Sequence, residues 1–334
     1  MKMQPGALLP YTQPPPAIDV TRGTSMRWDT TFRDNNLRNH DIDTLKRWVR
    51  HKLGGYHVPI NSIRADNLLY RGVRWGVRPT RVSQVSYPSA DVLHLIGLGR
   101  ANREGRAMFY ASRAAPAVFY EVRARAGDTI ALSEWGLSEQ LWMHNLGYHP
   151  DALKHLGTPA EITRPQLSAP IPGESAEHAR VRRRLSMSFA AEVQPRQDYR
   201  YKLSVAISET FFDGAEPLPL INDGFAPSST AAAGIVYPSM QLRGGADNVV
   251  IWPDFVEKYL RIRSILFIKV LHVDELAMHY ELQTIGAANE FADGDIVWRE
   301  TMPPEIECRT TIRLENGFLT MRNGHGHLYD AHRI

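Results

Sequence analysis

Apolar side chains recur at helical spacing in several parts of the chain. In residues 41–52, Leu45, Trp48 and Val49 recur at i, i+3 and i+4, which places them on one helix face. Gly54-Gly55 follows this segment and predicts its end. Comparable apolar spacing predicts further helices over residues 114–125, 137–145, 175–193, 201–212 and 254–261.

Short apolar runs bounded by turn residues predict strands between these helices. The run 234–239 is apolar and β-branched and stops at Pro238-Ser239. Near the C-terminus the residues alternate, and Asn316-Gly317 between two such runs is a hairpin signal. Residues 89–98 fit either a strand or a short helix. Strands are expected over residues 67–70, 107–111, 129–132, 234–239, 248–252, 267–273, 280–284, 310–314 and 318–321.

This order of helices and strands indicates an α+β protein with a mixed sheet. The first 25 residues hold five prolines, which fix φ and remove donors, so an extended or disordered arm is expected there. We expect an N-terminal arm and short helix over 1–60 and one domain over 61–334. That domain would comprise a core of 67–132 and 231–261, a largely helical insertion of 133–230 and a β-rich extension of 265–334.

Composition places the chain among ordinary globular proteins. Hydrophobic residues make up 43% and charged residues 22%, and no apolar run reaches the roughly 18 residues of a membrane helix. The single Cys308 excludes an intramolecular disulfide framework, and no secretory signal is apparent, so a cytoplasmic location is expected. A net charge of +3 is too small to indicate nucleic-acid binding, and neither nucleic acid nor membrane is expected as a direct partner.

Two charged residues stand beside apolar runs. Arg71 follows the expected strand 67–70, where a guanidinium can hold a phosphate group with two parallel bonds. The alternative is a surface arginine. Glu121 follows Val-Phe-Tyr and is either a rim residue or a functional acid.

Other candidates also have structural alternatives. Tyr110 lies in an apolar run and fits a core position as well as a ring stacked on a ligand. Ser239 fits a turn, and no Gly-x-Ser-x-Gly elbow surrounds it, so a hydrolase triad is not supported. Gly97-Leu98-Gly99 fails as a dinucleotide fingerprint because the third glycine would fall at Asn102. His325, His327 and His332 have no metal-site spacing, and no metal is expected.

Taken in order, several motifs resemble the RES domain family, which is named for an arginine, a glutamate and a serine. The similarity covers about residues 67–261. The chain is longer than compact members, with about 100 residues between the strand after Glu121 and the serine strand. The matching motifs are Tyr70-Arg71-Gly72, Arg100-x-Asn102-x-x-Gly105 with Met108-Phe109-Tyr110, Glu121, Tyr237-Pro238-Ser239, and the segment from Asn248 to Pro253.

The resemblance implies a fold related to the ADP-ribosyltransferases: a mixed β-sheet sandwich with flanking helices and NAD⁺ in a central cleft. It implies a toxin that depletes NAD⁺, with a helix-turn-helix antitoxin as its cognate partner. The implied catalytic residues are Arg71, Glu121 and Ser239, and the implied NAD⁺-binding residues are Arg71, Arg100, Asn102, Tyr110 and Asn248.

The residue types suit cleavage of the nicotinamide–ribose bond. Nicotinamide leaves from a cationic state, so one carboxylate suffices, unlike the paired acids of ordinary glycosidases. Glu121 would stabilise the developing ribose cation, and Arg71 would hold the pyrophosphate. Water, phosphate or a macromolecule could be the acceptor, the last giving an ADP-ribosyltransferase. A non-catalytic binding protein on the same fold is the other alternative.

Overall fold

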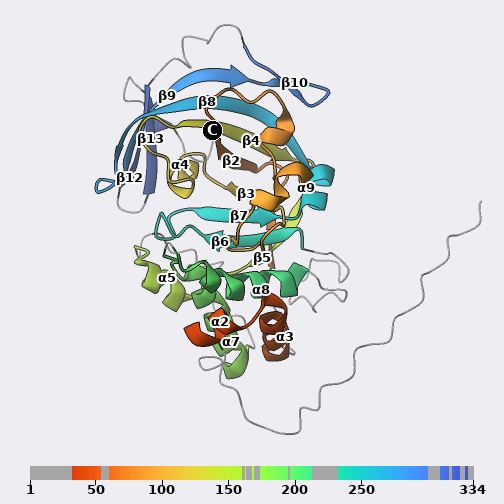
Figure 1. Ribbon diagram of the computed structural model, residues 1–334. Coiled ribbons are helices and arrows are strands. Elements are labelled where there is room, and N and C mark those ends of the chain that lie inside the picture. Colours follow the sequence, from red (N-terminus) through yellow and green to blue (C-terminus); the bar gives the residue numbers. More distant parts are fainter. Residues whose placement is uncertain are drawn as a thin grey trace, which may run out of the picture.

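The computed structural model shows an α+β fold with one large mixed sheet and several helices (Figure 1). The helices are α2 (Asp34–Asn39), α3 (Ile42–Lys52), α4 (Ala117–Glu121), α5 (Pro150–Leu156), α7 (Ala176–Ala190), α8 (Tyr201–Phe212) and α9 (Pro253–Tyr259). The structure describes residues 32–53, 60–159, 162, 168, 174–194, 196–212, 232–299, 309–315, 318–323 and 328–329.

Within the described ranges, twelve strands form the large sheet in the order β1-β5-β6-β7-β3-β2-β4-β8-β9-β12-β13-β14. The pairing of β5 with β6 is parallel, and the other pairs in this sheet are antiparallel. A separate hairpin joins β10 to β11. The strands are β1 (Ile60–Ile63), β2 (Leu68–Arg74), β3 (Phe109–Ser112), β4 (Thr129–Leu137), β5 (Leu141–Asn145), β6 (Gly234–Pro238), β7 (Asp247–Ile251), β8 (Leu260–Asp274), β9 (His279–Ala288), β10 (Glu290–Ala292), β11 (Asp295–Val297), β12 (Arg309–Glu315), β13 (Phe318–Asn323) and β14 (Leu328–Tyr329).

The sheet nearly divides between β2 and β3. These strands share a single residue pair, Tyr70 with Ser112, whereas β2 pairs with β4 along its whole length. One half therefore runs from β1 to β3, and the other runs from β2 to β14. Unpaired strand edges leave backbone polar groups without ladder partners, so the opening between the halves needs side chains or a ligand to fill it.

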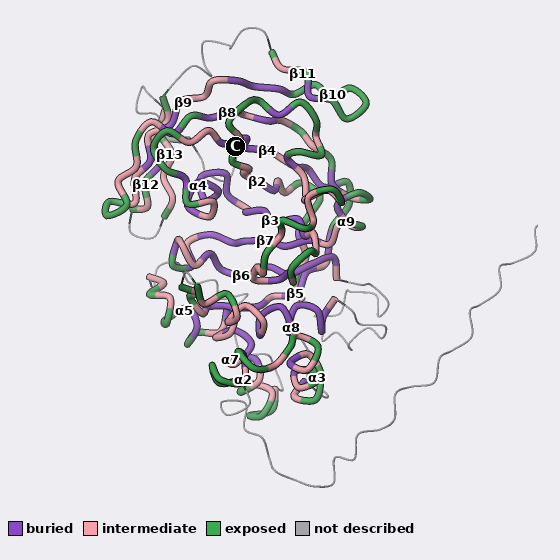
Figure 2. The backbone as a smooth tube through the Cα atoms, viewed as in Figure 1, coloured by how far each residue is buried: buried purple, intermediate pink, exposed green. Residues whose placement is uncertain are grey.

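A helical layer covers β6 and β7. In α3, the Asp41 side chain caps the helix by accepting from the Thr44 amide at 2.7 Å, and Leu45 and Val49 are fully buried. They pack with α8 and α7 against Ile235 of β6 in one cluster. Figure 2 shows the resulting buried stretch along α8, with the exposed faces of α2 and α3 turned outward.

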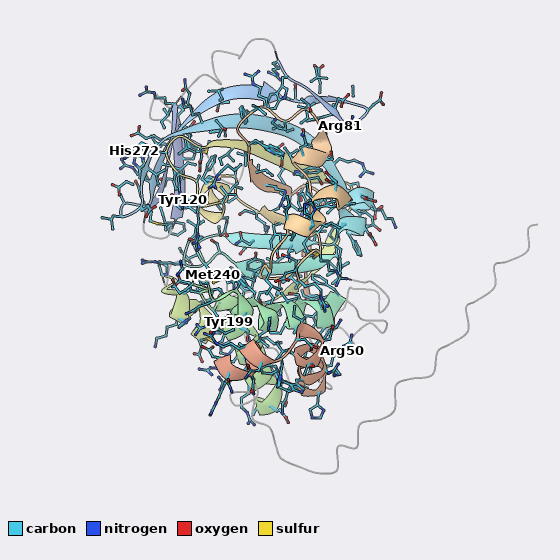
Figure 3. The ribbon with its side chains drawn as sticks, in the orientation of Figure 1. Arg50, Arg81, Tyr120, Tyr199, Met240 and His272 are labelled. Carbon is cyan, nitrogen blue, oxygen red and sulfur yellow. The ribbon has the colours of Figure 1, made fainter. Side chains whose placement is uncertain are left out.

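Helix α4 lies on the other side, between β6–β7 and β12–β13 (Figure 1). Its apolar residues pack against β4, β8 and β9. Tyr120, labelled in Figure 3, donates from its hydroxyl to the Met278 carbonyl at 2.7 Å and meets the Tyr280 ring edge-on at 4.8 Å. This anchoring fixes the residue that follows, Glu121, at the end of the helix.

Most elements with a strong local pattern are confirmed. Helices appear at the predicted 41–52, 175–193 and 201–212, and strands appear at 234–239 and 248–252. The predicted C-terminal hairpin is confirmed by the pairing of β12 with β13, although Asn316-Gly317 lies outside the described residues. Strands β8, β9, β12 and β13 extend the same sheet as the core strands.

Two helical predictions fail in part or entirely. Residues 137–145, expected to be helical, instead end β4 and form β5, where Leu141 and Met143 are buried around the less buried Trp142. Leu137, Leu141 and Trp142 fit helical spacing equally well, so only pairing with β1 and β6 decides the outcome. The helix expected over 114–125 is shortened to α4.

Strand boundaries also differ. The strand expected to end at Tyr70 continues to Arg74, so Arg71 lies inside β2 rather than at its end. Seven consecutive pairs with β4 stabilise this extension. Residues 89–98, left open between strand and helix, contain a 3₁₀ helix over Ala90–Leu95. The division into arm, core, insertion and extension remains a prediction, and the arm over 1–31 lies outside the described residues.

Candidate functional site

A cavity of about 240 Å³ opens where β2 and β3 diverge. Its walls come from both halves of the sheet and from α4, so residues distant in sequence meet there. The lining residues are Tyr70, Arg71, Gly72, Tyr110, Ala111, Ser112, Val118, Glu121, Val122, Tyr237 and Asn248. Four of the residues predicted for the site therefore share one cavity.

Glu121 is held in a fixed position at the end of α4. Its carboxylate accepts hydrogen bonds from the Ser239 hydroxyl and the Asn248 side chain. Burial raises the pKa of Glu121, while these two bonds and the positive charges of Arg100 and Arg123 act in the opposite direction. The site thus contains one oriented carboxyl group whose charged form depends on its neighbours.

Ser239 supports Glu121 from behind the cavity wall. The residue is fully buried and does not line the cavity. Its oxygen accepts from the Leu242 amide at 3.1 Å while its hydrogen is donated to Glu121. The turn after β6 therefore orients the serine, and the serine orients the carboxylate. This geometry suits a positioning residue rather than a nucleophile.

Arg71 spans the opening between the two halves of the sheet. Its Nε donates to the Ser86 carbonyl at 2.9 Å and its Nη1 donates to the Tyr110 carbonyl at 2.8 Å. Burial lowers the pKa of Arg71 to about 10, so the guanidinium stays charged at neutral pH. Among the described residues no carboxylate forms an ion pair with it. A partly buried cation without a counter-ion favours binding of an anion.

The two carbonyl bonds modify the role predicted for Arg71. They use one Nε–H and one Nη1–H, while the remaining guanidinium donors have no partner among the described residues. The Arg71 side chain therefore links β2 to β3 through the Tyr110 carbonyl, and its remaining N–H groups are available to a ligand. Binding by the two parallel Nε and Nη bonds of a free arginine is not open to it.

Tyr110 lines the cavity, and its hydroxyl bonds to the neighbouring loop. The hydroxyl donates to Asn102 Oδ1 at 2.8 Å and accepts from the Ala101 amide at 2.9 Å. Burial raises the pKa of Tyr110, so the phenol is neutral. The Tyr110 hydroxyl is therefore already occupied, which leaves the aromatic ring as the part of the side chain that a ligand can contact.

Arg100 and Asn102, predicted to contact the ligand, are absent from the cavity lining. Arg100 donates to the carbonyls of Phe189 at 2.6 Å and Ala191 at 3.2 Å, at the C-terminal end of α7. Asn102 Nδ2 donates to the carbonyls of Gly97 and Arg103, both at 3.0 Å. Both residues shape the loop that supports Tyr110.

A buried ionic cluster anchors the same loop to the helical layer. Glu209 of α8 is 2% exposed and accepts from Arg103 at 2.5 and 2.6 Å and from Arg106 at 3.1 Å. Lys46 of α3 lies 3.5 Å from the same carboxylate. No local pattern indicates this cluster, because its members are separated by up to 163 positions, from Lys46 to Glu209. Removing Glu209 would leave Arg103 with only its bond to Asp43 at 2.8 Å and would weaken the link between the loop and α8.

Sequence reasoning assigned no role to two other residues at the cavity. Tyr237 lines it and belongs to the Tyr-Pro-Ser motif, which offered a usable signal. Gly72 allows α4 to approach β2, because a Cβ there would lie 2.2 Å from Val118 Cγ1. Gly72 belongs to the Tyr70-Arg71-Gly72 motif, but the sequence does not show that Val118 is the side chain packed against it.

In the part of the chain that the structure describes, no group of three or more histidine, cysteine, aspartate or glutamate side chains is placed to hold a metal ion. No described helix has the length and apolar character needed to span a membrane. His325, His327 and His332 lie outside the described ranges.

Comparisons with protein-family models, curated proteins and solved structures gave no match for this chain. The resemblance to the RES domain family therefore rests on the motifs alone and remains a prediction.

Proposed function

We propose that the protein cleaves the nicotinamide–ribose bond of NAD⁺, with water or phosphate as acceptor, and so degrades NAD⁺. The observation that carries the proposal is the pairing of opposite charges in one cavity. Glu121 supplies a held carboxylate, and Arg71 supplies a guanidinium without a carboxylate partner among the described residues. NAD⁺ has the complementary pattern, a cationic nicotinamide riboside joined to an anionic pyrophosphate.

The cavity volume suits one end of this substrate. About 240 Å³ is slightly below the range of about 300–1,000 Å³ that is usual for sites enclosing whole ligands. We therefore place the nicotinamide riboside unit inside and the rest of the dinucleotide toward the mouth. Tyr110 and Tyr237 provide aromatic walls for the flat nicotinamide ring.

The reaction needs one carboxylate. The bond between ribose C1′ and the ring nitrogen breaks, its electron pair stays on the nitrogen, and neutral nicotinamide leaves. Positive charge develops on the ribose, where ionised Glu121 stabilises it. Water then adds to C1′ and loses a proton to solvent, or phosphate adds in its place.

Ser239 and Asn248 act by holding Glu121, since both donate hydrogen bonds to its carboxylate. These bonds fix the carboxylate before the substrate arrives, which reduces reorganisation during bond cleavage. Arg71 orients the substrate through its remaining donors. Arg100 and Asn102 do not contact the substrate in this proposal, and instead hold the loop that supports Tyr110.

The fold is compatible with a relationship to the ADP-ribosyltransferases, which we also propose. Its two sheet halves meet at one residue pair, and the cavity lies at that junction, as expected for a cleft between sheets. The motifs that resemble the RES domain family supply Arg71, Tyr110, Glu121 and Asn248 to its lining.

The direct test is chromatographic detection of nicotinamide after the purified protein is incubated with NAD⁺, with and without phosphate. Release is expected, and phosphate dependence of the product would identify the acceptor. The variant Glu139→Gln should release nicotinamide at the wild-type rate, because Glu139 is an exposed carboxylate outside the cavity lining. It is the matched control for removing the charge of Glu121. No release from folded protein in either buffer would reject the proposal.

A further inference from the structure

Arg123 lies two residues after the end of α4, in a backbone conformation that favours glycine. Its φ is 46°, in the left-handed region. Its amide donates to the Tyr120 carbonyl and the Ala124 amide donates to the Phe119 carbonyl, both at 3.0 Å. These bonds form a Schellman motif, in which glycine or asparagine normally occupies this position. An arginine here is strained, and strained residues persist when the surroundings hold them.

The surroundings of this turn do hold it. Arg74 of β2 donates from Nη2 to the carbonyls of Val122 and Arg123, both at 3.1 Å. Arg74 is in turn paired with Asp128 at 2.9 Å. The strained turn is thus tied to the strand that carries Arg71.

The Arg123 side chain differs from those of nearby arginines. Arg74 is paired with Asp128, and Arg113 with Asp247. Arg123 is exposed, and within the described part of the chain no carboxylate forms an ion pair with it. Its two preceding neighbours, Glu121 and Val122, line the cavity, and its charge acts on the Glu121 carboxyl.

We propose that Arg123 is a specificity-determining residue that binds the phosphate groups of the substrate at the mouth of the cavity. The inference rests on the proposed function, because it places the nicotinamide riboside unit inside the cavity and extends the pyrophosphate from Arg71 toward the mouth. Arg123 is exposed and directly follows the lining residue Val122, and a guanidinium matches a phosphate in charge and in donor geometry. Glycine at this position would relax the turn but remove that contact.

The test compares two ligands that share the scissile bond. NAD⁺ carries the pyrophosphate, and nicotinamide riboside carries no phosphate. Binding is measured by calorimetry, and cleavage by nicotinamide release. For Arg123→Gly we expect a roughly tenfold weaker affinity and higher KM for NAD⁺, in line with loss of one charge-assisted contact. Affinity and KM for nicotinamide riboside should stay unchanged, and the unfolding midpoint should rise.

Two further variants separate charge from backbone strain. Arg123→Gln removes the charge but keeps a side chain at positive φ, so it should weaken NAD⁺ binding without raising the unfolding midpoint. Arg125→Gln removes an exposed arginine two positions further on and should leave both ligands unaffected.

The outcomes distinguish this inference from the proposed function. Undiminished preference for NAD⁺ over nicotinamide riboside in Arg123→Gly would overturn the role of Arg123, whatever the turnover. Loss of that preference in binding, without cleavage by wild type, would support Arg123 and reject NAD⁺ degradation. Failure of wild type to bind either ligand would reject both.

Discussion

The hydroxyl of Ser239 donates a hydrogen bond to the carboxylate of Glu121, although 118 positions separate the two residues. The serine follows β6 and the glutamate ends α4, so the bond links the turn after β6 to the end of α4. The same oxygen accepts from the Leu242 amide, which fixes its orientation. The position of the central carboxylate therefore depends on a turn far from it in sequence.

Ser239→Ala should lower turnover by roughly tenfold to a hundredfold, because a carboxylate that loses its anchor is misplaced by a fraction of an ångström or more. The Ser239 bond also lowers the pKa of Glu121. Its loss should therefore shift the acidic limb of the pH–rate profile to higher pH. Ser83→Ala, at an exposed serine, is the control. An unchanged pH profile would contradict the assigned contact.

Gly72→Ala should disturb the site by steric pressure alone. The new Cβ would meet Val118 Cγ1, a β-branched side chain with little freedom to move. We expect a loss of about 1–3 kcal/mol in the free energy of unfolding, together with reduced turnover as α4 shifts. Gly76→Ala is a matched control, because nothing lies within 4 Å of a Cβ there. Equal stability of the two variants in denaturant titration would contradict the close approach of α4 to β2.

His144 should make the fold sensitive to acid. It is 5% exposed, its Nδ1 has no partner among the described residues, and burial lowers its pKa from 6.5 to about 4. The stability contribution of the neutral imidazole is complete above about pH 6.5. It is lost as pH falls toward 4, because the unfolded chain takes up a proton that the folded protein excludes.

The expected size of this effect is about 3 kcal/mol in the free energy of unfolding between those pH values. His144→Leu should remove most of it, whereas His51→Leu, at an exposed histidine of α3, should not. Denaturant titrations across this pH range measure the difference. Parallel pH dependence of wild type and His144→Leu would show that another group is responsible.

Local sequence patterns predicted several of the buried helices and strands correctly. Helix α8 matches the predicted 201–212, and every residue from 203 to 211 in it is buried. Strands β6 and β7 match because their runs are short, apolar and closed by proline. Residues 137–145 did not, because the apolar spacing there fits a helix and a strand equally well and long-range pairing decides.

The sequence predicted several of the residues that line the cavity but not the contacts that they make. Arg71, Tyr110, Glu121 and Asn248 do line one cavity. Arg100 and Asn102 do not, because backbone carbonyls compete for their donors. The carbonyls that bind Arg71 and the glycine that admits α4 are products of tertiary packing, so no local spacing reveals them.

The proposed reaction depends on Glu121, which we propose stabilises a ribose cation during NAD⁺ cleavage. Glu121→Gln keeps the shape and the hydrogen-bond acceptor for Ser239 but removes the charge. Since burial raises the pKa of Glu121, the variant should be at least as stable as wild type at neutral pH, where the ionised carboxylate is most costly.

The most direct measurement is therefore nicotinamide release by wild type and Glu121→Gln under identical conditions, with NAD⁺ binding measured by calorimetry in parallel. We expect release by wild type, a fall of roughly 10²–10³-fold or more in the variant, and similar NAD⁺ affinity in both. A folded Glu121→Gln variant that binds NAD⁺ and releases nicotinamide at the wild-type rate would contradict this proposal.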